Sequence, residues 1–439
     1  MSAMPMPFLL HRAAGVISTI ILISGLWFVA DWIGTDLRGG FWLVSGLVLL
    51  SFALFGRLMV ARGVRRHDER SANTPLPCDE EAVTGSGGSR LHVSCYGVKG
   101  APTIVLTHDW GLDQSALVET VRPLARCYRV ITWDLPGLGR SGRPFDAVYT
   151  VERFAEDLRA VVEVAGRSPV LLVGHGAGAM ISLAFCKAHP ELVGRKVKGV
   201  ALVAGSSRPL LEVSGNSTFL RSVRAAVIEP LIELSIVASP AVHLTAWASY
   251  LNGLSALITR AYGFGPDPGR REVDYAAWLA TRQAPSVVAR GLRALMDWPG
   301  LGDYAPPIPV VTIAPRFDVL IKPELMGFPG ETQAGAHIIE LDNAGHLAPL
   351  EQPEALAMMV LQQAGKVFPA RAGLGARTHA EVLSQVHTAI EPLREARSFA
   401  GGEPRDDALP PEPAASPDQP HPLHRSWDSR LDGEPFGTA

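Results

Sequence analysis

Two long apolar stretches lie near the start of the chain. Residues 13–33 and 39–60 are almost free of charged side chains, and each is close to the roughly 20 apolar residues that a membrane-spanning helix needs. A cleavable secretory signal has a shorter apolar core and is not followed by a second such stretch. The pattern therefore predicts a membrane anchor over residues 1–62 with two transmembrane helices; two helices buried in a protein core are the alternative.

The charges that flank these stretches predict their orientation. Arg12 precedes the first stretch, and the connection between the two holds Asp31, Asp36 and Arg38. The arginines that come at and after the end of the second stretch are Arg57, Arg62, Arg65, Arg66 and Arg70. Because basic segments stay in the cytoplasm, we expect an integral protein of a bacterial-type inner or plasma membrane, with its globular part cytoplasmic.

From residue 79 onward, short apolar runs alternate with helical patterns. Phe154, Leu158 and Val161 recur at helical spacing between two of the runs. The runs are TIVLTH, RVITWD, VLLVGH, VKGVALVA, IPVVTIA and HIIELD. Strands that are buried on both faces have continuous apolar sequences, and helices between them indicate parallel pairing. Residues 79–370 are therefore predicted to form an α/β domain with a doubly wound, mostly parallel sheet.

The remaining segments predict a linker, a cap and a tail. Residues 63–78 are polar and predict a linker, and residues 206–300 form an insert between two predicted strands, which favours a helical cap. From Leu234 to Thr259 the insert has no Asp, Glu, Lys or Arg, so a third membrane span is the alternative. Residues 371–439 are expected to form one helix and a Pro-rich acidic tail. The tail has too little apolar surface to offset the entropy of ordering, so we expect it to be disordered.

Composition excludes several classes of function. The net charge is −3, so nothing indicates nucleic acid as a partner. The four cysteines form no C-x-x-C pair and are expected to be free thiols. No phosphate-binding loop and no cluster of histidines and cysteines with metal-ligand spacing is present. We expect no cofactor and no metal.

Five phrases, taken in order, resemble the α/β-hydrolase superfamily over residues 90–367. They are LTHDWGLDQSAL, DLPGLGRSGRP, VGHGAGAM, VTIAPRFDVLIKP and LDNAGHLAPLEQPEAL. The resemblance implies an α/β-hydrolase fold with a helical cap and a nucleophile on a sharp strand-to-helix turn, the elbow, followed along the chain by an acid and a histidine. It also implies hydrolysis of an ester-like or other lipophilic small molecule.

The resemblance assigns the acid and the histidine but not the nucleophile. His346 matches the histidine and Asp318 the acid, whereas Gly176 stands where the nucleophilic serine belongs; His175 and Ala177 flank it. A loop aspartate that caps a helix and a structural histidine are the alternatives for Asp318 and His346.

The oxyanion position also departs from the family pattern. His108 is followed by Asp109 and Trp110, where the family usually has His-Gly. A carboxylate there would repel a developing oxyanion. The phrase HDWG also resembles the nucleophile phrase of epoxide hydrolases and haloalkane dehalogenases, but it follows a different strand.

Three hypotheses follow from these departures. In the first, Asp318 orients His346, which activates a water molecule held where the serine hydroxyl is missing. In the second, Asp109 is a carboxylate nucleophile. In the third, the protein is a catalytically inactive pseudo-hydrolase that binds a lipophilic ligand or a protein, since loss of the serine hydroxyl costs orders of magnitude in rate.

The orientation predicts the result of a reporter experiment. Alkaline phosphatase fused to the C-terminus should be inactive in intact bacterial cells, and a green fluorescent protein fusion at the same point should fluoresce, because the arginines keep this end cytoplasmic. Enzyme activity of the phosphatase fusion would contradict the predicted orientation.

Overall fold

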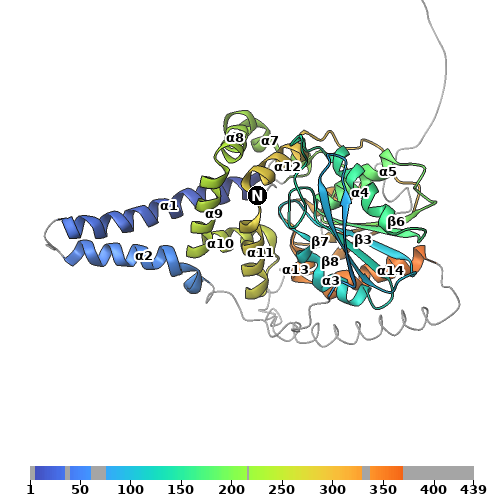
Figure 1. Cartoon of the computed structure of the whole chain (residues 1–439), viewed down its shortest axis with the longest axis horizontal. Coiled ribbons are helices and arrows are strands. Elements are labelled where there is room, and N and C mark those ends of the chain that lie inside the picture. Colours follow the sequence, from blue (N-terminus) through green and yellow to red (C-terminus); the bar gives the residue numbers. More distant parts are fainter. Residues whose placement is uncertain (1–4, 35–39, 61–75, 215–216, 329–336, 369–439) are drawn as a thin grey trace, which may run out of the picture. The chain divides into compact units, whose positions relative to one another are not determined.

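The computed structural model describes residues 5–34, 40–60, 76–214, 217–328 and 337–368 (Figure 1). Helices α1 (Pro5–Gly34) and α2 (Gly40–Val60) pack against each other, and both are long and apolar enough to cross a membrane. Helix α1 begins before the predicted stretch 13–33, so Arg12 lies inside the helix rather than in front of it. Residues 63–75 of the predicted linker and the tail 371–439 lie outside the described residues.

The domain that follows is built on an eight-stranded sheet of order β1-β2-β4-β3-β5-β6-β7-β8. Strand β2 pairs antiparallel with β1 and β4, and all other pairs are parallel. The strands are β1 (Asp79–Thr84), β2 (Arg90–Gly97), β3 (Thr103–Thr107), β4 (Arg129–Trp133), β5 (Val170–His175), β6 (Val197–Val203), β7 (Val310–Pro315) and β8 (His337–Leu341). The prediction of a doubly wound, mostly parallel sheet is confirmed.

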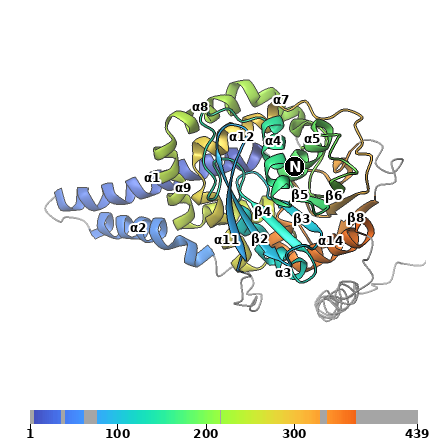
Figure 2. The same cartoon turned by 45° about the vertical axis from the view of Figure 1, so that its right-hand side comes forward.

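Helices cover both faces of the sheet (Figure 2). Helices α4 (Val151–Val164) and α5 (Ala177–Ala188) pack together on one face, and α3 (Val118–Leu124) and α14 (Pro353–Val367) pack together on the other. Phe154, Leu158 and Val161 are fully buried on the inner side of α4, as their spacing predicts, and the Thr150 side chain caps this helix. The short helix α13 (Ala348–Glu351) precedes α14.

The insert between β6 and β7 forms a cap of helices. They are α6 (Leu210–Val213), α7 (Ser217–Val223), α8 (Glu229–Val237), α9 (Ser239–Asn252), α10 (Leu254–Gly263), α11 (Arg270–Arg282) and α12 (Pro285–Asp297). The uncharged stretch is not one straight helix, because residues 218–237 and 239–252 meet at an angle of 104°. Gly253, at φ +89°, then separates α9 from α10.

Polar and close contacts join the helix pair to the cap. Helix α1 packs against α9 and α10. The buried Asn252 amide donates a hydrogen bond of 2.7 Å to the Ser18 hydroxyl. Arg57 pairs with Asp274 at 3.2 Å. A Cβ at Gly15 would come within 2.8 Å of the Thr245 hydroxyl, so glycine allows α1 to approach α9 closely.

Candidate active site

The site forms where β3 and β5 end side by side. These strands are parallel neighbours, with Thr107 opposite Gly174, so the loop after β3 and the turn after β5 meet at one edge of the sheet. The turn is sharp, since Gly176 has φ +54° and ψ −114° and α5 starts at the next residue. A Cβ at Gly178 would lie 2.4 Å from the Thr107 carbonyl oxygen, so this flanking glycine is required by close packing.

The carboxylate of Asp109 occupies the place of the missing serine side chain. A Cβ built on Gly176 would lie only 2.1 Å from Asp109 Oδ1. The Ala177 amide, which follows the nucleophile position, donates a hydrogen bond of 2.6 Å to the same oxygen. The side chain is almost fully buried. The space at the elbow is therefore taken by a carboxylate, and the expectation that it would hold a water molecule is wrong.

His346 lies between two carboxylates. Its Nε2 is 3.0 Å from Asp109 Oδ2, and its Nδ1 is 2.7 Å from Asp318 Oδ2. The other oxygen of Asp318 accepts hydrogen bonds from two backbone amides of its own loop. Asp318 therefore fixes its loop and orients the imidazole at the same time. The two amides belong to a bend before the short helix Pro323–Leu325, so Asp318 does not cap that helix.

The charges of this group are strongly coupled. Burial lowers the pKa of His346, but the two carboxylates outweigh burial and raise its pKa to about 10. Burial alone would raise the pKa of Asp109, yet its hydrogen bond to His346 and the charge there bring that pKa below its ordinary value. At neutral pH the site holds an imidazolium between two carboxylates, so His346 is not a free base in the resting protein.

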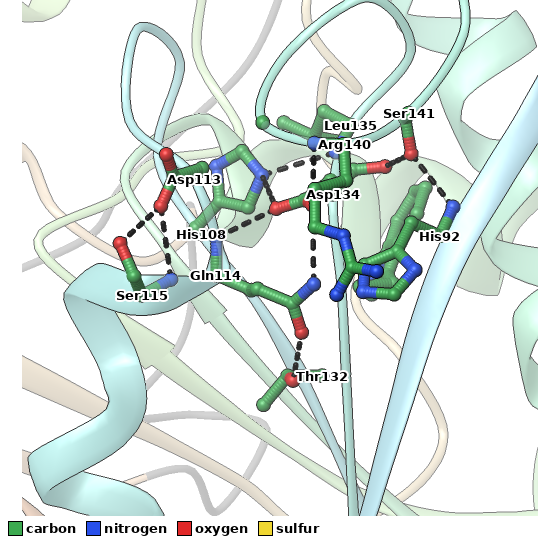
Figure 3. Close-up of polar contacts among 12 residues, drawn as sticks. His92, His108, Asp113, Gln114, Ser115, Thr132, Asp134, Leu135, Arg140 and Ser141 are labelled. Atoms are coloured by element: carbon green, nitrogen blue, oxygen red, sulfur yellow. Dashed lines mark hydrogen bonds and ion pairs between the residues drawn. The ribbon is translucent and has the colours of Figure 1, made fainter. Parts of the chain in front are cut away.

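The two histidines beside the site are structural. His108 is fully buried, and its Nε2 accepts the Leu135 amide at 3.0 Å (Figure 3). Its Nδ1 therefore donates to the Asp109 carbonyl oxygen at 2.8 Å. His175 Nε2 donates to the His346 carbonyl oxygen at 2.7 Å, and burial lowers the pKa of His175 to about 4. Both residues hold the backbone of the residues that form the site.

A polar network anchors the loop that carries Asp109 (Figure 3). Asp134 accepts hydrogen bonds from the Gln114 amide at 2.8 Å and from the Arg140 amide at 2.9 Å. Ser141 donates a hydrogen bond to the Asp134 carbonyl oxygen and lies in this network. Its role is to fix the loop.

Asp109 and His346 border a mostly apolar cavity of about 230 Å³. Trp110 lines it, whereas His108, His175 and Ala177 are not among the lining residues. Helices α9, α10, α11 and α12 supply most of the remaining surface, and the first turns of α1 and nearby loops also contribute. The sequence pattern does not indicate that α1 lines the cavity, because an apolar stretch long enough to span a membrane does not mark pocket residues.

Glu351 is a further residue whose part in the site the sequence pattern does not indicate. This buried carboxylate accepts hydrogen bonds from the Gly345 amide at 2.8 Å and the Gly265 amide at 3.0 Å. It therefore ties the loop of His346 to the cap.

The contact between Asp109 and Gly176 predicts a coupled pair of substitutions. Gly176→Ser should lower the free energy of unfolding by about 1–3 kcal/mol, because the new side chain overlaps the carboxylate. The combination with Asp109→Gly should cost less than the sum of the single changes, which a double-mutant cycle from denaturant unfolding measures.

Gly178→Ala is the matched control for this cycle, since its Cβ meets the Thr107 carbonyl oxygen instead. It should destabilise the protein equally with and without Asp109→Gly. Strict additivity of the Gly176→Ser pair would contradict the overlap.

Comparison with known proteins supports the same fold. The profile of the alpha/beta hydrolase family matches residues 104–359. The esterase of Thermogutta terrifontis has a similar structure, with a TM-score of 0.53 at 20% identity over 66% of this chain and 99% of the esterase. The esterase of Exiguobacterium antarcticum has a TM-score of 0.51 at 16% identity over 65% of this chain and 99% of that chain.

Curated relatives match the chain over shorter segments. RutD of Caulobacter segnis, provisionally named a carbamate hydrolase, is 31% identical over 121 residues, 26% of this chain and 44% of the relative. Epoxide hydrolase 4 of Mus musculus is 28% identical over 107 residues, 24% of this chain and 30% of the relative. The matched segments span less than half of these relatives, whose names describe hydrolases. With the family profile matching more than half of its residues, this chain belongs to the alpha/beta hydrolase family.

Proposed function

We propose that this protein is a membrane-anchored hydrolase that uses Asp109 as a carboxylate nucleophile on a small lipophilic electrophile such as an epoxide. The observation that carries the proposal is the position of the Asp109 carboxylate, between His346 Nε2 at 3.0 Å and the Ala177 amide at 2.6 Å. The carboxylate replaces the missing hydroxyl although it comes from the loop after another strand.

In the first step, Asp109 Oδ2 attacks a carbon of the epoxide. The carbon–oxygen bond of the ring breaks, and the alkoxide takes the Nε2 proton of the His346 imidazolium. The products are an ester on Asp109 and a neutral imidazole. The raised pKa of His346 suits this step, because the imidazole enters it protonated.

In the second step, neutral His346 removes a proton from water, which attacks Cγ of the Asp109 ester. Negative charge develops on Oδ1, which already accepts the Ala177 amide, so a donor is in place for it. The intermediate then expels the product alkoxide, which takes the proton of the new Asp109 carboxylic acid. The diol leaves, and the ionised carboxylate and the imidazolium are restored.

This chemistry favours an alkyl electrophile over the ester-like substrate that the family resemblance implies. A carboxylate that attacks an ester would form an anhydride, which is less stable than the ester. The Ala177 amide is also occupied by Asp109 and is not available to an external oxyanion. The partial match to an epoxide hydrolase agrees with a carboxylate nucleophile.

The anchor is part of the proposal. Apolar side chains remain exposed along the outer parts of α1 and α2, among them Ile20, Ile23, Trp27, Val44 and Val48. A lipid bilayer would cover them, and the arginines at and after the end of α2 favour a cytoplasmic globular domain. An apolar cavity next to a bilayer suits a lipophilic substrate that partitions into lipid.

A non-catalytic role is the second candidate. The imidazolium and both carboxylates satisfy one another in the resting site, and the amide at the elbow is occupied. A pseudo-hydrolase that binds a lipophilic ligand or a protein would need no more than this.

The charge coupling predicts a shift on removal of one carboxylate. In histidine-labelled protein followed by NMR, His346 should stay protonated through neutral pH and titrate toward pH 10, and Asp109→Asn should lower its pKa. The ion pair of His346 with Asp109 contributes its full stabilisation of the folded protein below the unfolded pKa of histidine, about 6.5. This stabilisation is lost as the pH rises toward the folded pKa of about 10. Titration of His346 near pH 6.5 in both proteins would contradict the coupling.

The covalent step predicts a trapped ester. We expect His346→Gln protein incubated with 1-bromooctane to accumulate a mass increase on the peptide that contains Asp109. Displacement of bromide needs no proton from His346, so the ester forms, but water is not activated to remove it. The parent protein in ¹⁸O-labelled water should incorporate ¹⁸O into the Asp109 carboxylate during turnover.

Two controls make this experiment decisive. Asp109→Asn should form neither adduct nor diol, whereas Asp303→Asn, the same change at an exposed aspartate outside the cavity, should keep turnover. Diol formation that survives Asp109→Asn would overturn the mechanism. Absence of both adduct and diol with the epoxide and with 1-bromooctane would favour the non-catalytic role.

A further inference from the structure

Helix α1 is longer than a membrane span requires. Its 30 residues correspond to about 45 Å of helix at about 1.5 Å per residue, whereas the hydrocarbon core of a bilayer is about 30 Å thick. The surplus lies at the end that begins with Pro5. Phe8, His11 and Arg12 from this end line the cavity that Asp109 and His346 border. The anchor thus contributes directly to the wall of the pocket.

Arg12 is a cation in this wall without an anionic partner. Within residues 5–34, 40–60, 76–214, 217–328 and 337–368 it has neither an ion pair nor a hydrogen bond, and its Nε is buried without an acceptor. Its guanidinium instead lies over the Phe8 ring, 4.9 Å from the ring centre. Arg12 as a whole is half-buried, but its Nε is fully buried. Because burial of a cationic group without a counter-charge is costly, this part of the cavity favours an anion.

The Asp109 carboxylate, which also lines the cavity, does not supply that counter-charge. Asp109 is paired with His346, and no ion pair joins it to Arg12 within the described residues. The rest of the lining is largely apolar, with Leu112, Ile258, Val288 and Leu292 among its residues. The cavity lining therefore combines an unpaired cation, an apolar surface and the Asp109–His346 pair.

We infer that the pocket binds an amphiphile with an anionic group, held by Arg12, and an apolar body that extends toward His346. Arg12 determines specificity: its guanidinium forms charge-assisted hydrogen bonds with a carboxylate or phosphate oxygen. This orientation also keeps the anion of the ligand away from Asp109. The inference rests on the proposed function for the reactive end of the ligand, but binding to Arg12 does not require turnover.

The test is binding of octanoate and 1-octanol by the full-length protein in phosphatidylcholine nanodiscs. We expect radiolabelled octanoate to bind at least about tenfold more tightly than octanol in equilibrium dialysis, after subtraction of empty nanodiscs. Arg12→Gln should abolish that preference by weakening octanoate about tenfold while changing octanol less than about twofold. A tenfold change corresponds to about 1.4 kcal/mol of binding free energy.

Two variants separate charge recognition from damage to the helix. Arg12→Lys keeps the positive charge and should retain most of the preference for octanoate. Arg260→Gln removes an exposed arginine of α10, a helix that also lines the pocket, and should change nothing. Equal loss of both ligands in Arg12→Gln and Arg12→Lys, or no preference for octanoate in the parent, would overturn the inference.

A further arm identifies the source of the anion. If the group held by Arg12 is a lipid headgroup, nanodiscs that contain phosphatidylglycerol should weaken octanoate binding in the parent but not in Arg12→Gln. If it belongs to a free amphiphile, the lipid should have no such effect. Both results support an anion site at Arg12. Because only binding is measured, failure of the ester mechanism at Asp109 would leave these results unchanged.

Discussion

The whole site depends on one close approach, that of the Asp109 carboxylate to Gly176. The carboxylate reaches the elbow only because residue 176 has no Cβ, which would lie 2.1 Å from Oδ1. Once there, it accepts the Ala177 amide and completes the row Asp109–His346–Asp318. The two departures from the family pattern, an acid after β3 and a glycine after β5, are therefore one structural change. The position of the Asp109 carboxylate depends on the glycine at 176.

The sheet explains why much of the fold could be predicted and the meeting of these residues could not. Continuous apolar runs such as Val170–His175 need only local sequence to be recognised as buried strands, and Phe154 and Leu158 needed only helical spacing. Along the chain, Asp109 follows β3, whereas the nucleophile of the family follows β5. In space β3 and β5 are neighbours, and the direction of a side chain across that pair is a tertiary property.

The anchor shows a second limit of sequence patterns. The length of the apolar stretches identified the two helices. It did not reveal that α1 starts before the predicted span and that its first turns line the cavity. The contacts that seat it there, such as Asn252 with Ser18, join residues that are 234 positions apart. Hydropathy is blind to such pairs because each partner alone is an ordinary polar residue in an apolar helix. Arg12 was for this reason interpreted only as a topology signal.

The two-carboxylate arrangement has a further consequence for catalysis in a buried site. The resting group carries two negative charges and one positive charge. In the proposed ester, Asp109 and His346 are both neutral and Asp318 remains charged, so the net charge of the group stays the same. The tetrahedral intermediate and the imidazolium restore one charge of each sign, and the net value is again unchanged.

Because moving net charge into a low-dielectric interior is costly, a cycle that only redistributes charge avoids that cost. A neutral nucleophile beside the His346–Asp318 pair starts from the same net charge, but its attack creates one positive and one negative charge. The attack by the Asp109 carboxylate instead removes one charge of each sign.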